Sequence, residues 1–163
     1  MDKKTRIAVF VSGGGTNLQA IIDAEKSGII KSGKTELVIS DNPEAYALER
    51  AKANGIKTAV VLKNNGQAEF EKKISEILAE NKIEMIILAG FMCILSADFT
   101  SKWPERIINI HPSLIPSFCG KGCYGLHVHE KALAYGVKVT GATVHFVNEI
   151  PDGGEIIAQR AVE

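Results

Sequence analysis

The alternation of short β-branched runs with helix-length segments restricts the fold of this chain more than any other feature. Residues 7–11 form the first apolar run, a glycine turn follows at 12–17, and apolar residues then recur at helical spacing. The same order repeats, with predicted strands at 37–40, 58–62 and 85–89 and predicted helices at 44–54 and 67–82. This alternation predicts an α/β fold with a doubly wound, mainly parallel sheet and helices on both faces.

The second half of the chain has shorter elements and more turn residues. Its pattern predicts helices at residues 97–103 and 129–135 and strands at 106–110, 139–147 and 155–162, the last of them a candidate antiparallel strand. Residues 111–126 lie between two of these elements and are rich in proline and glycine. A loop of this length in a compact domain is usually functional.

Composition and charge exclude several classes of protein. The chain has 163 residues, 45% of them hydrophobic, which suits one soluble globular domain. Lys and Arg together number 19, as do Asp and Glu, so no basic excess favours nucleic acid or an anionic membrane. The apolar runs are far shorter than a bilayer span, and we expect a cytoplasmic protein.

Three cysteines, Cys93, Cys119 and Cys123, are too few and too irregular for the disulfide framework of a small secreted protein. We expect reduced thiols. Cys119 and Cys123 precede His127 and His129, which raises the alternative of a zinc site. Their spacing matches none of the usual structural zinc patterns, so we predict no metal.

The glycine turn at residues 12–17 lies where a predicted strand gives way to a predicted helix. Free backbone amides and the positive end of the helix can hold a phosphate there, and glycines allow close approach. The turn is not a P-loop, because the required Lys and Ser/Thr are missing, and Leu18 stands where a dinucleotide fingerprint has its third glycine. A tight strand-to-helix turn without a ligand is the alternative.

Asn109 and His111 are two positions apart at the carboxyl end of the predicted strand at 106–110, so their side chains lie on the same side. Open α/β sheets bind ligands at that edge. Asn can hydrogen-bond a carbonyl oxygen that gains negative charge, and His can exchange protons near neutral pH, so the pair suits acyl transfer. A histidine that only caps the strand is the structural alternative.

Asp152 begins an Asp-Gly-Gly sequence between two predicted strands, a pattern that is more often a turn than a catalytic element. If the fold brings Asp152 against His111, the carboxylate would favour the imidazolium form and make it a better proton donor to a developing oxyanion. This contact is the hypothesis that joins the two loops.

These segments together resemble the phosphoribosylglycinamide formyltransferase family, a branch of the folate-dependent formyltransferases. The resemblance rests on the order and spacing of residues 12–21, 89–95, 109–116 and 152–154, and it covers nearly the whole chain. It implies a Rossmann-like fold and transfer of a formyl group from 10-formyltetrahydrofolate, the co-substrate, to the amine of 5'-phosphoribosylglycinamide in purine biosynthesis. It implies small-molecule partners and no metal, nucleic acid or membrane.

The resemblance also assigns roles to individual residues. Asn109, His111 and Asp152 would form the catalytic trio, and the loop at 148–152 would border the folate pocket. The phosphoribosyl group would be held by Gly15, Thr16 and Asn17, and folate would contact Met92, Cys93, Ile94, Leu95 and Asn109.

Three departures from the family pattern stand out. Many members have Arg where Cys93 stands and another Arg near Gln67, where it holds the folate tail. Residues 118–124 are longer than the usual connection, and Lys121 there either faces solvent, which we expect, or approaches the phosphate. The family continues beyond residue 163, so we expect residues 1–163 to form a single catalytic domain without the C-terminal segment.

Other functions share parts of this pattern. Methionyl-tRNA formyltransferase has the same three catalytic residue types but adds a basic domain, and formyltetrahydrofolate hydrolase uses water as acceptor. A binding module without catalysis is an alternative of a different class. The sequence does not determine the oligomeric state.

Overall fold

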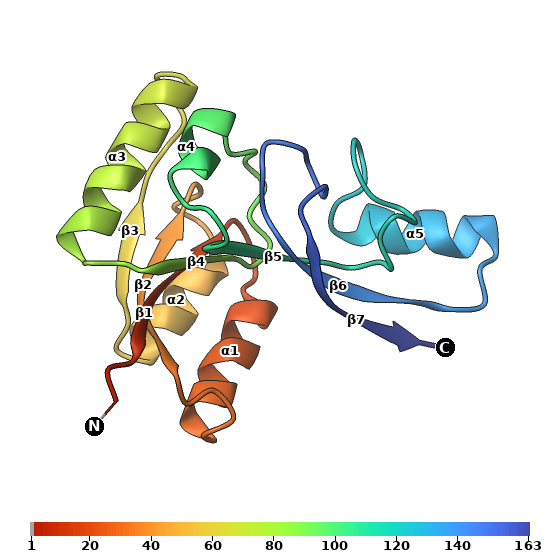
Figure 1. Cartoon of the computed structure of the whole chain (residues 1–163), viewed down its shortest axis with the longest axis horizontal. Helices are drawn as coiled ribbons and strands as arrows, with labels where there is room; N and C mark the ends of the chain where they lie inside the picture. Colours follow the sequence, from red (N-terminus) through yellow and green to blue (C-terminus); the bar gives the residue numbers. More distant parts are fainter. Residues whose placement is uncertain (1) are drawn as a thin grey trace. The chain divides into compact units, whose positions relative to one another are not determined.

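The strands and helices of the structure, a computed structural model that describes residues 2–163, follow the predicted alternation (Figure 1). The chain divides into a first unit that ends at Cys93 and a second unit, Ile94–Glu163. None of the helices in the described residues has the length and apolar character needed to cross a membrane.

The first unit contains four parallel strands in the order β3-β2-β1-β4, with β1 in the interior. The strands are β1 (Thr5–Val11), β2 (Gly33–Ser40), β3 (Lys57–Val60) and β4 (Met85–Leu88). Three helices connect them: α1 (Thr16–Lys26), α2 (Tyr46–Ala53) and α3 (Gln67–Glu80). Parallel neighbours need crossover connections. A helix therefore follows each of β1, β2 and β3 and returns the chain to the end of the sheet where the next strand begins.

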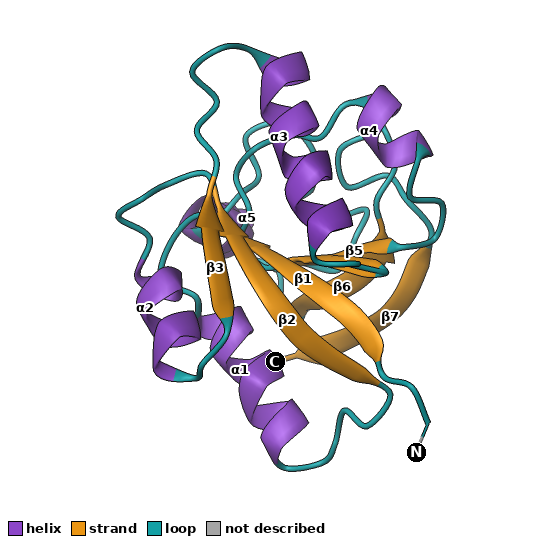
Figure 2. Ribbon diagram, turned by 90° about the vertical axis from the view of Figure 1, so that its left-hand side faces the viewer, coloured by secondary structure: helices purple, strands orange, loops and turns teal. Residues whose placement is uncertain are grey.

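Both faces of this sheet are covered by helices. Val9 and Val11 of β1 share a buried cluster with Leu18 of α1 and Leu48 of α2. On the other face Phe91 packs between Phe10 of β1 and Phe70 of α3, with ring centroids 5.3 and 6.5 Å away. Figure 2 shows α3 on one side of the strands and α1 and α2 on the other. The predicted doubly wound α/β architecture is confirmed.

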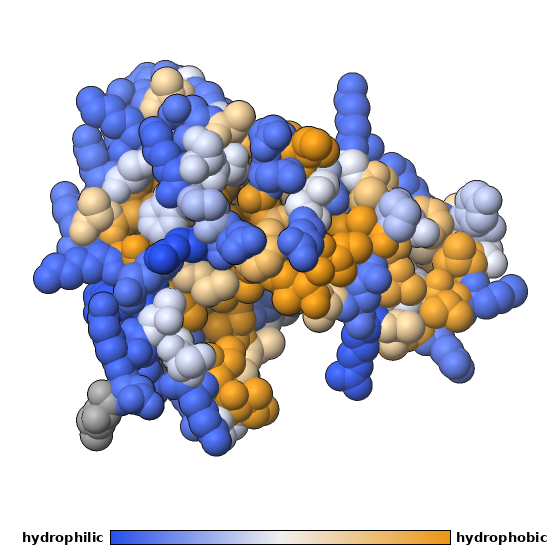
Figure 3. Space-filling model, viewed as in Figure 1, coloured by the Kyte–Doolittle hydropathy of each residue, from blue (hydrophilic) through white to orange (hydrophobic). Residues whose placement is uncertain are grey.

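The second unit is built on an antiparallel ladder. It contains α4 (Ala97–Ser101), β5 (Ile107–His111), α5 (Leu126–Tyr135), β6 (Thr140–Phe146) and β7 (Ile156–Val162). β6 pairs antiparallel with both β5 and β7, so the predicted antiparallel direction of the last strand is confirmed. Every residue of β7 is exposed, including the hydrophobic Ile156, Ile157 and Val162. Figure 3 shows places where hydrophobic residues, in orange, reach the surface.

Several boundaries differ from the sequence-based expectation. β2 begins at Gly33, four residues before the predicted strand at 37–40, because Thr5 of β1 pairs with Gly33. α3 ends at Glu80 and not at residue 82, because Lys82 adopts a positive φ of 51°. α5 begins at Leu126, three residues before the predicted helix at 129–135, and buries Val128 in its first turn. Tertiary packing thus set the ends that propensity did not.

A substitution at Gly15 tests how the first βα turn packs. Gly15 has a φ of 76°, and a Cβ there would lie 2.6 Å from the Cβ and 2.7 Å from the Cα of Ala47 in α2. A Cβ at Gly14 would meet nothing within 4 Å. We expect Gly15→Ala to lower the free energy of unfolding by about 2–4 kcal/mol and Gly14→Ala by less than about 1 kcal/mol. Urea unfolding of both variants checks this, and equal losses would contradict the packing account.

Candidate active site

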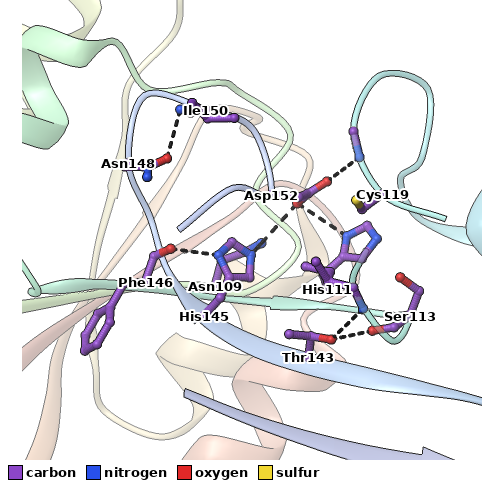
Figure 4. A network of polar contacts seen from close by, with 12 residues as sticks. Asn109, His111, Ser113, Cys119, Thr143, His145, Phe146, Asn148, Ile150 and Asp152 are labelled. Carbon is purple, nitrogen blue, oxygen red and sulfur yellow. Dashed lines mark hydrogen bonds and ion pairs between the residues drawn. The ribbon is translucent and has the colours of Figure 1, made fainter. Parts of the chain in front are cut away.

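The polar residues of the second unit meet where β5 pairs with β6 (Figure 4). Asn109 lies opposite His145 in the register, and His111 lies opposite Thr143. Residues two apart in a strand point to the same face, so these four side chains form one cluster. Strand geometry alone therefore places Asn109 and His111 together, as the sequence predicted.

His111 is almost fully buried, and both ring nitrogens face oxygen atoms. Its Nε2 lies 2.8 Å from the carbonyl oxygen of Phe118, and its Nδ1 lies 3.5 Å from Oδ1 of Asp152. Because a carbonyl oxygen only accepts, Nε2 carries a hydrogen that it donates to Phe118. The second nitrogen faces the Asp152 carboxylate at a distance longer than a usual hydrogen bond.

Asp152 reaches His111 from the loop between β6 and β7. Its Oδ2 accepts a hydrogen bond of 2.9 Å from the backbone N–H of Gly120, and its φ is 55°. A Cβ at Gly154 would lie 1.6 Å from the carbonyl oxygen of Phe146, so only glycine allows the loop to lie this close to β6. The Asp-Gly-Gly sequence is therefore both a turn and the support of a carboxylate.

His145 is a member of this cluster that sequence reasoning missed. Its Nδ1 donates to the Phe146 carbonyl oxygen at 2.8 Å, and its Nε2 accepts from Asn109 Nδ2 at 3.1 Å. A ring that donates at one nitrogen and accepts at the other is neutral. Its Nε2 also lies 3.9 Å from Asp152 Oδ1. One hydrogen of the Asn109 amide group is used here, which leaves the second for another acceptor.

The buried face of β6 explains why His145 was missed. Thr143 and His145 are buried, while their apolar neighbours Ala142, Val144 and Phe146 are less buried. The usual rule that apolar residues of a strand face inward would assign the opposite face. The available signal was two polar residues two positions apart in a strand, at the same spacing as Asn109 and His111.

The loop that follows β5 contains Cys119 and Cys123, and Cys93 lies after β4. Cys119, Cys123 and Cys93 are free thiols. Burial, and then the negative charge of Asp152, raise the pKa of the Cys119 thiol. Within residues 2–163 no group of three or more His, Cys, Asp and Glu side chains is placed to hold a metal ion. The Lys121 side chain is exposed, in agreement with the expected solvent-facing position.

The backbone carbonyl oxygens of the glycine turn accept hydrogen bonds from other residues of the first unit. Ala47 N–H donates to the Gly13 carbonyl at 3.0 Å, Arg50 Nε donates to the Gly14 carbonyl at 2.8 Å, and Asn42 Nδ2 donates to the Ser12 carbonyl at 3.2 Å. All three donors come from the segment that follows β2. The protein therefore binds this turn through its acceptors.

The backbone amides at the end of this turn and the start of α1 have no hydrogen-bond acceptor in the part of the chain that the structure describes. α1 begins without a side-chain cap, and within the described residues the N–H groups of Thr16, Asn17 and Leu18 donate no hydrogen bond. The side chains of Thr16 and Asn17 are exposed. Free amides at the positive end of an 11-residue helix are a suitable site for an anion.

The residues predicted to contact folate differ in exposure. Met92 and Ile94 are exposed, with 52% and 64% of their surface accessible, whereas Leu95 is buried at 4%. The Cys93 thiol donates to Asp41 Oδ2 at 3.1 Å. Met92 and Ile94 can therefore offer apolar side chains to a ligand, while Leu95 packs in the core.

A pocket of about 230 Å³ lies in the second unit but is not lined by Asn109, His111 or Asp152. It is lined by residues of α4 and by Asn148 and Gly154, which flank Asp152 on its loop. The polar cluster brings a histidine and a carboxylate together, a kind of pair that is common at active sites.

Comparisons with known proteins agree with the fold. A glycinamide ribonucleotide transformylase 1 structure from Symbiobacterium toebii superimposes with a TM-score of 0.89 and 41% identity, covering 98% of this chain and 73% of that one. The phosphoribosylglycinamide formyltransferase of Haemophilus influenzae is 44% identical over 159 residues, which are 96% of this chain and 72% of that protein.

Longer relatives also match. The human trifunctional purine biosynthetic protein adenosine-3 is 45% identical over 162 residues, which are 98% of this chain but only 15% of that protein. The family model described as formyl transferase matches residues 5–163. On this match and on the similarity to its relatives, the chain belongs to the formyl transferase family.

Proposed function

We propose that this chain transfers a formyl group from 10-formyltetrahydrofolate to the amine of 5'-phosphoribosylglycinamide, a reaction of purine biosynthesis. The observation that carries the proposal is the contact of Asp152 with His111 beside Asn109. The names of relatives that match nearly all of this chain support the choice of substrates. No metal or covalent enzyme intermediate is required.

The proposed chemistry begins with attack of the substrate amine on the formyl carbon. The formyl oxygen gains negative charge as the tetrahedral intermediate forms, and the second hydrogen of the Asn109 amide stabilises that charge. His111 donates a hydrogen bond or a proton from Nδ1, because its Nε2 is committed to Phe118. The intermediate then collapses as the bond between the formyl carbon and the folate nitrogen breaks, the proton lost by the attacking amine passes to that nitrogen, and any proton taken up by the formyl oxygen returns to His111. Tetrahydrofolate leaves and the formyl group stays on the amine.

Asp152 has two roles in this scheme. Its carboxylate lies against the almost fully buried ring of His111 and orients it. It also assists removal of the proton that the attacking amine loses. The hydrogen bond from Gly120 N–H fixes the carboxylate in place for both roles.

The glycine turn is the proposed site of the substrate phosphate, with Gly15, Thr16 and Asn17 around it. Free amides at the start of α1 support this assignment. The exposed Gly13 and Gly14 also support it, because an added Cβ at either would meet nothing within 4 Å and a ligand can approach the backbone closely. Met92, Cys93, Ile94 and Leu95, with Asn109, are the proposed folate contacts. The exposed Met92 and Ile94 suit an apolar ring system best.

We also propose a cytoplasmic location and a single catalytic domain over residues 1–163. Three free thiols suit a reducing compartment. The exposed side chains of β7 support the expectation that further polypeptide covers this strand in the active protein.

Variants of the catalytic trio test the proposed mechanism. We expect His111→Ala and Asp152→Asn each to lower kcat by roughly 10²–10⁴-fold, since each removes a group that acts mainly in the transition state. The two groups act together, so the double variant should be much less impaired than the product of the single effects. Steady-state kinetics with both substrates measures this.

His127→Ala is the matched control, because His127 is an exposed histidine that also contacts a carboxylate, that of Glu130. It should keep normal kcat. Near-normal kcat in His111→Ala, or a fully multiplicative double variant, would show that His111 only caps the strand.

A substitution at Gly14 tests the phosphate site more cleanly than one at Gly15, whose Cβ would strike α2. A Cβ at Gly14 meets open space, so any loss of affinity reflects the ligand. We expect Gly14→Ala to weaken phosphoribosylglycinamide binding roughly tenfold, about 1.4 kcal/mol, and to leave folate binding unchanged. Calorimetric titration of the folded variant measures both, and equal effects on the two ligands would refute the site.

A further inference from the structure

The Asp41 carboxylate connects two segments that are far apart in the sequence. It lies in the loop after β2, and both of its oxygen atoms accept hydrogen bonds. Oδ1 accepts from the Ser12 hydroxyl at 2.6 Å, and Oδ2 accepts from the Cys93 thiol at 3.1 Å. Ser12 begins the glycine turn, and Cys93 lies in the segment after β4.

The Ser12 hydroxyl extends this connection. It accepts a hydrogen bond of 2.8 Å from the backbone N–H of Met92 while it donates to Asp41. Ser12 is only 9% exposed, so water cannot readily replace either partner. The donor and acceptor directions of the hydroxyl are therefore fixed, and the turn and the segment at Met92 and Cys93 are held in one arrangement.

We propose that Asp41 is a positioning residue for both substrate sites: through Ser12 it fixes the phosphate-binding turn, and through Met92 and Cys93 it fixes the folate-bordering segment. This inference rests on the proposed function. Asp41 is not expected to touch either substrate, so its effect should be on affinity and not on the chemical step.

The Cys93 thiol reports the state of this contact. Burial, and then the hydrogen bond and the charge of Asp41, raise the pKa of the Cys93 thiol to about 11, while the positive charge of Lys63 lowers it. A thiol with a raised pKa holds its proton up to higher pH, and only the thiolate is alkylated. Removing the charge of Asp41 should therefore lower the pKa and make Cys93 react faster at a fixed pH.

Two variants distinguish the hydrogen bond of Asp41 with Ser12 from its hydrogen bond with Cys93, the two arms of the contact. Asp41→Asn keeps a side-chain oxygen for the Ser12 hydroxyl but loses the charge and the acceptor for Cys93, whereas Asp41→Ala loses both arms. For Asp41→Asn we expect the KM for 10-formyltetrahydrofolate to rise roughly threefold to tenfold, with little change for phosphoribosylglycinamide. For Asp41→Ala we expect both KM values to rise roughly tenfold, with kcat within about threefold of the parent.

Alkylation provides a readout that needs no substrate. The rate of Cys93 modification by iodoacetamide at about pH 8.5, followed by mass spectrometry, should rise at least roughly threefold in Asp41→Asn. Glu44→Gln is the matched control, since it removes one exposed negative charge from the same loop and should change neither alkylation nor KM. All variants should react at the same rate in denaturant.

The outcomes that would overturn the inference differ from those that would overturn the proposed function. Normal KM values in Asp41→Ala, a loss confined to kcat, or alkylation of Cys93 that does not respond to Asp41→Asn would refute the positioning role in a working enzyme. A parent chain without any formyl transfer would refute the proposed function, and this inference with it, even if the alkylation difference persisted.

Discussion

The contact between the Asp152 carboxylate and the His111 ring is the interaction on which the proposed chemistry depends. The His111 side chain is 5% exposed and that of Asp152 is 15% exposed, so little water separates or surrounds the two groups. The backbone maintains this contact. Asp152 has a positive φ, its neighbour Gly154 lies against the Phe146 carbonyl, and Gly120 N–H binds its second oxygen. Strained or tightly packed backbone of this kind is common at functional sites.

The proposed catalytic trio and the proposed phosphate turn use different scaffolds. The trio depends on an antiparallel pair, in which β6 adds His145 and Thr143 opposite Asn109 and His111. The phosphate turn depends on a parallel βα unit, in which the segment after β2 holds the turn by its carbonyl groups and leaves its amides free. The proposed catalytic groups are therefore side chains, whereas the proposed phosphate ligands are backbone amides.

The sequence predicted the fold well because the pattern of apolar runs is strong in the first unit. Residues 7–11 and 85–89 are nearly all apolar, and β1 and β4 form where they were expected. The ends of β2, α3 and α5 were wrong by two to four residues, since strand register and loop conformation set them. Local propensity carries little information on either.

The site was predicted in its main residues but not in its supporting contacts. Asn109, His111 and Asp152 meet as expected, and their proposed roles remain predictions. His145 and Asp41 were missed because each becomes important only through partners distant in sequence, Asn109 for one and Ser12 and Cys93 for the other. Gly15 has a packing reason in Ala47 that the sequence alone did not reveal.

The most direct test of the account is a comparison of acceptors. Initial rates of formyl release from 10-formyltetrahydrofolate would be measured with phosphoribosylglycinamide, with initiator methionyl-tRNA and with water alone as the acceptor. The account predicts rapid transfer to phosphoribosylglycinamide and only slow release with the other two. Equal or faster release to water or to the tRNA, or no difference among the three, would contradict it.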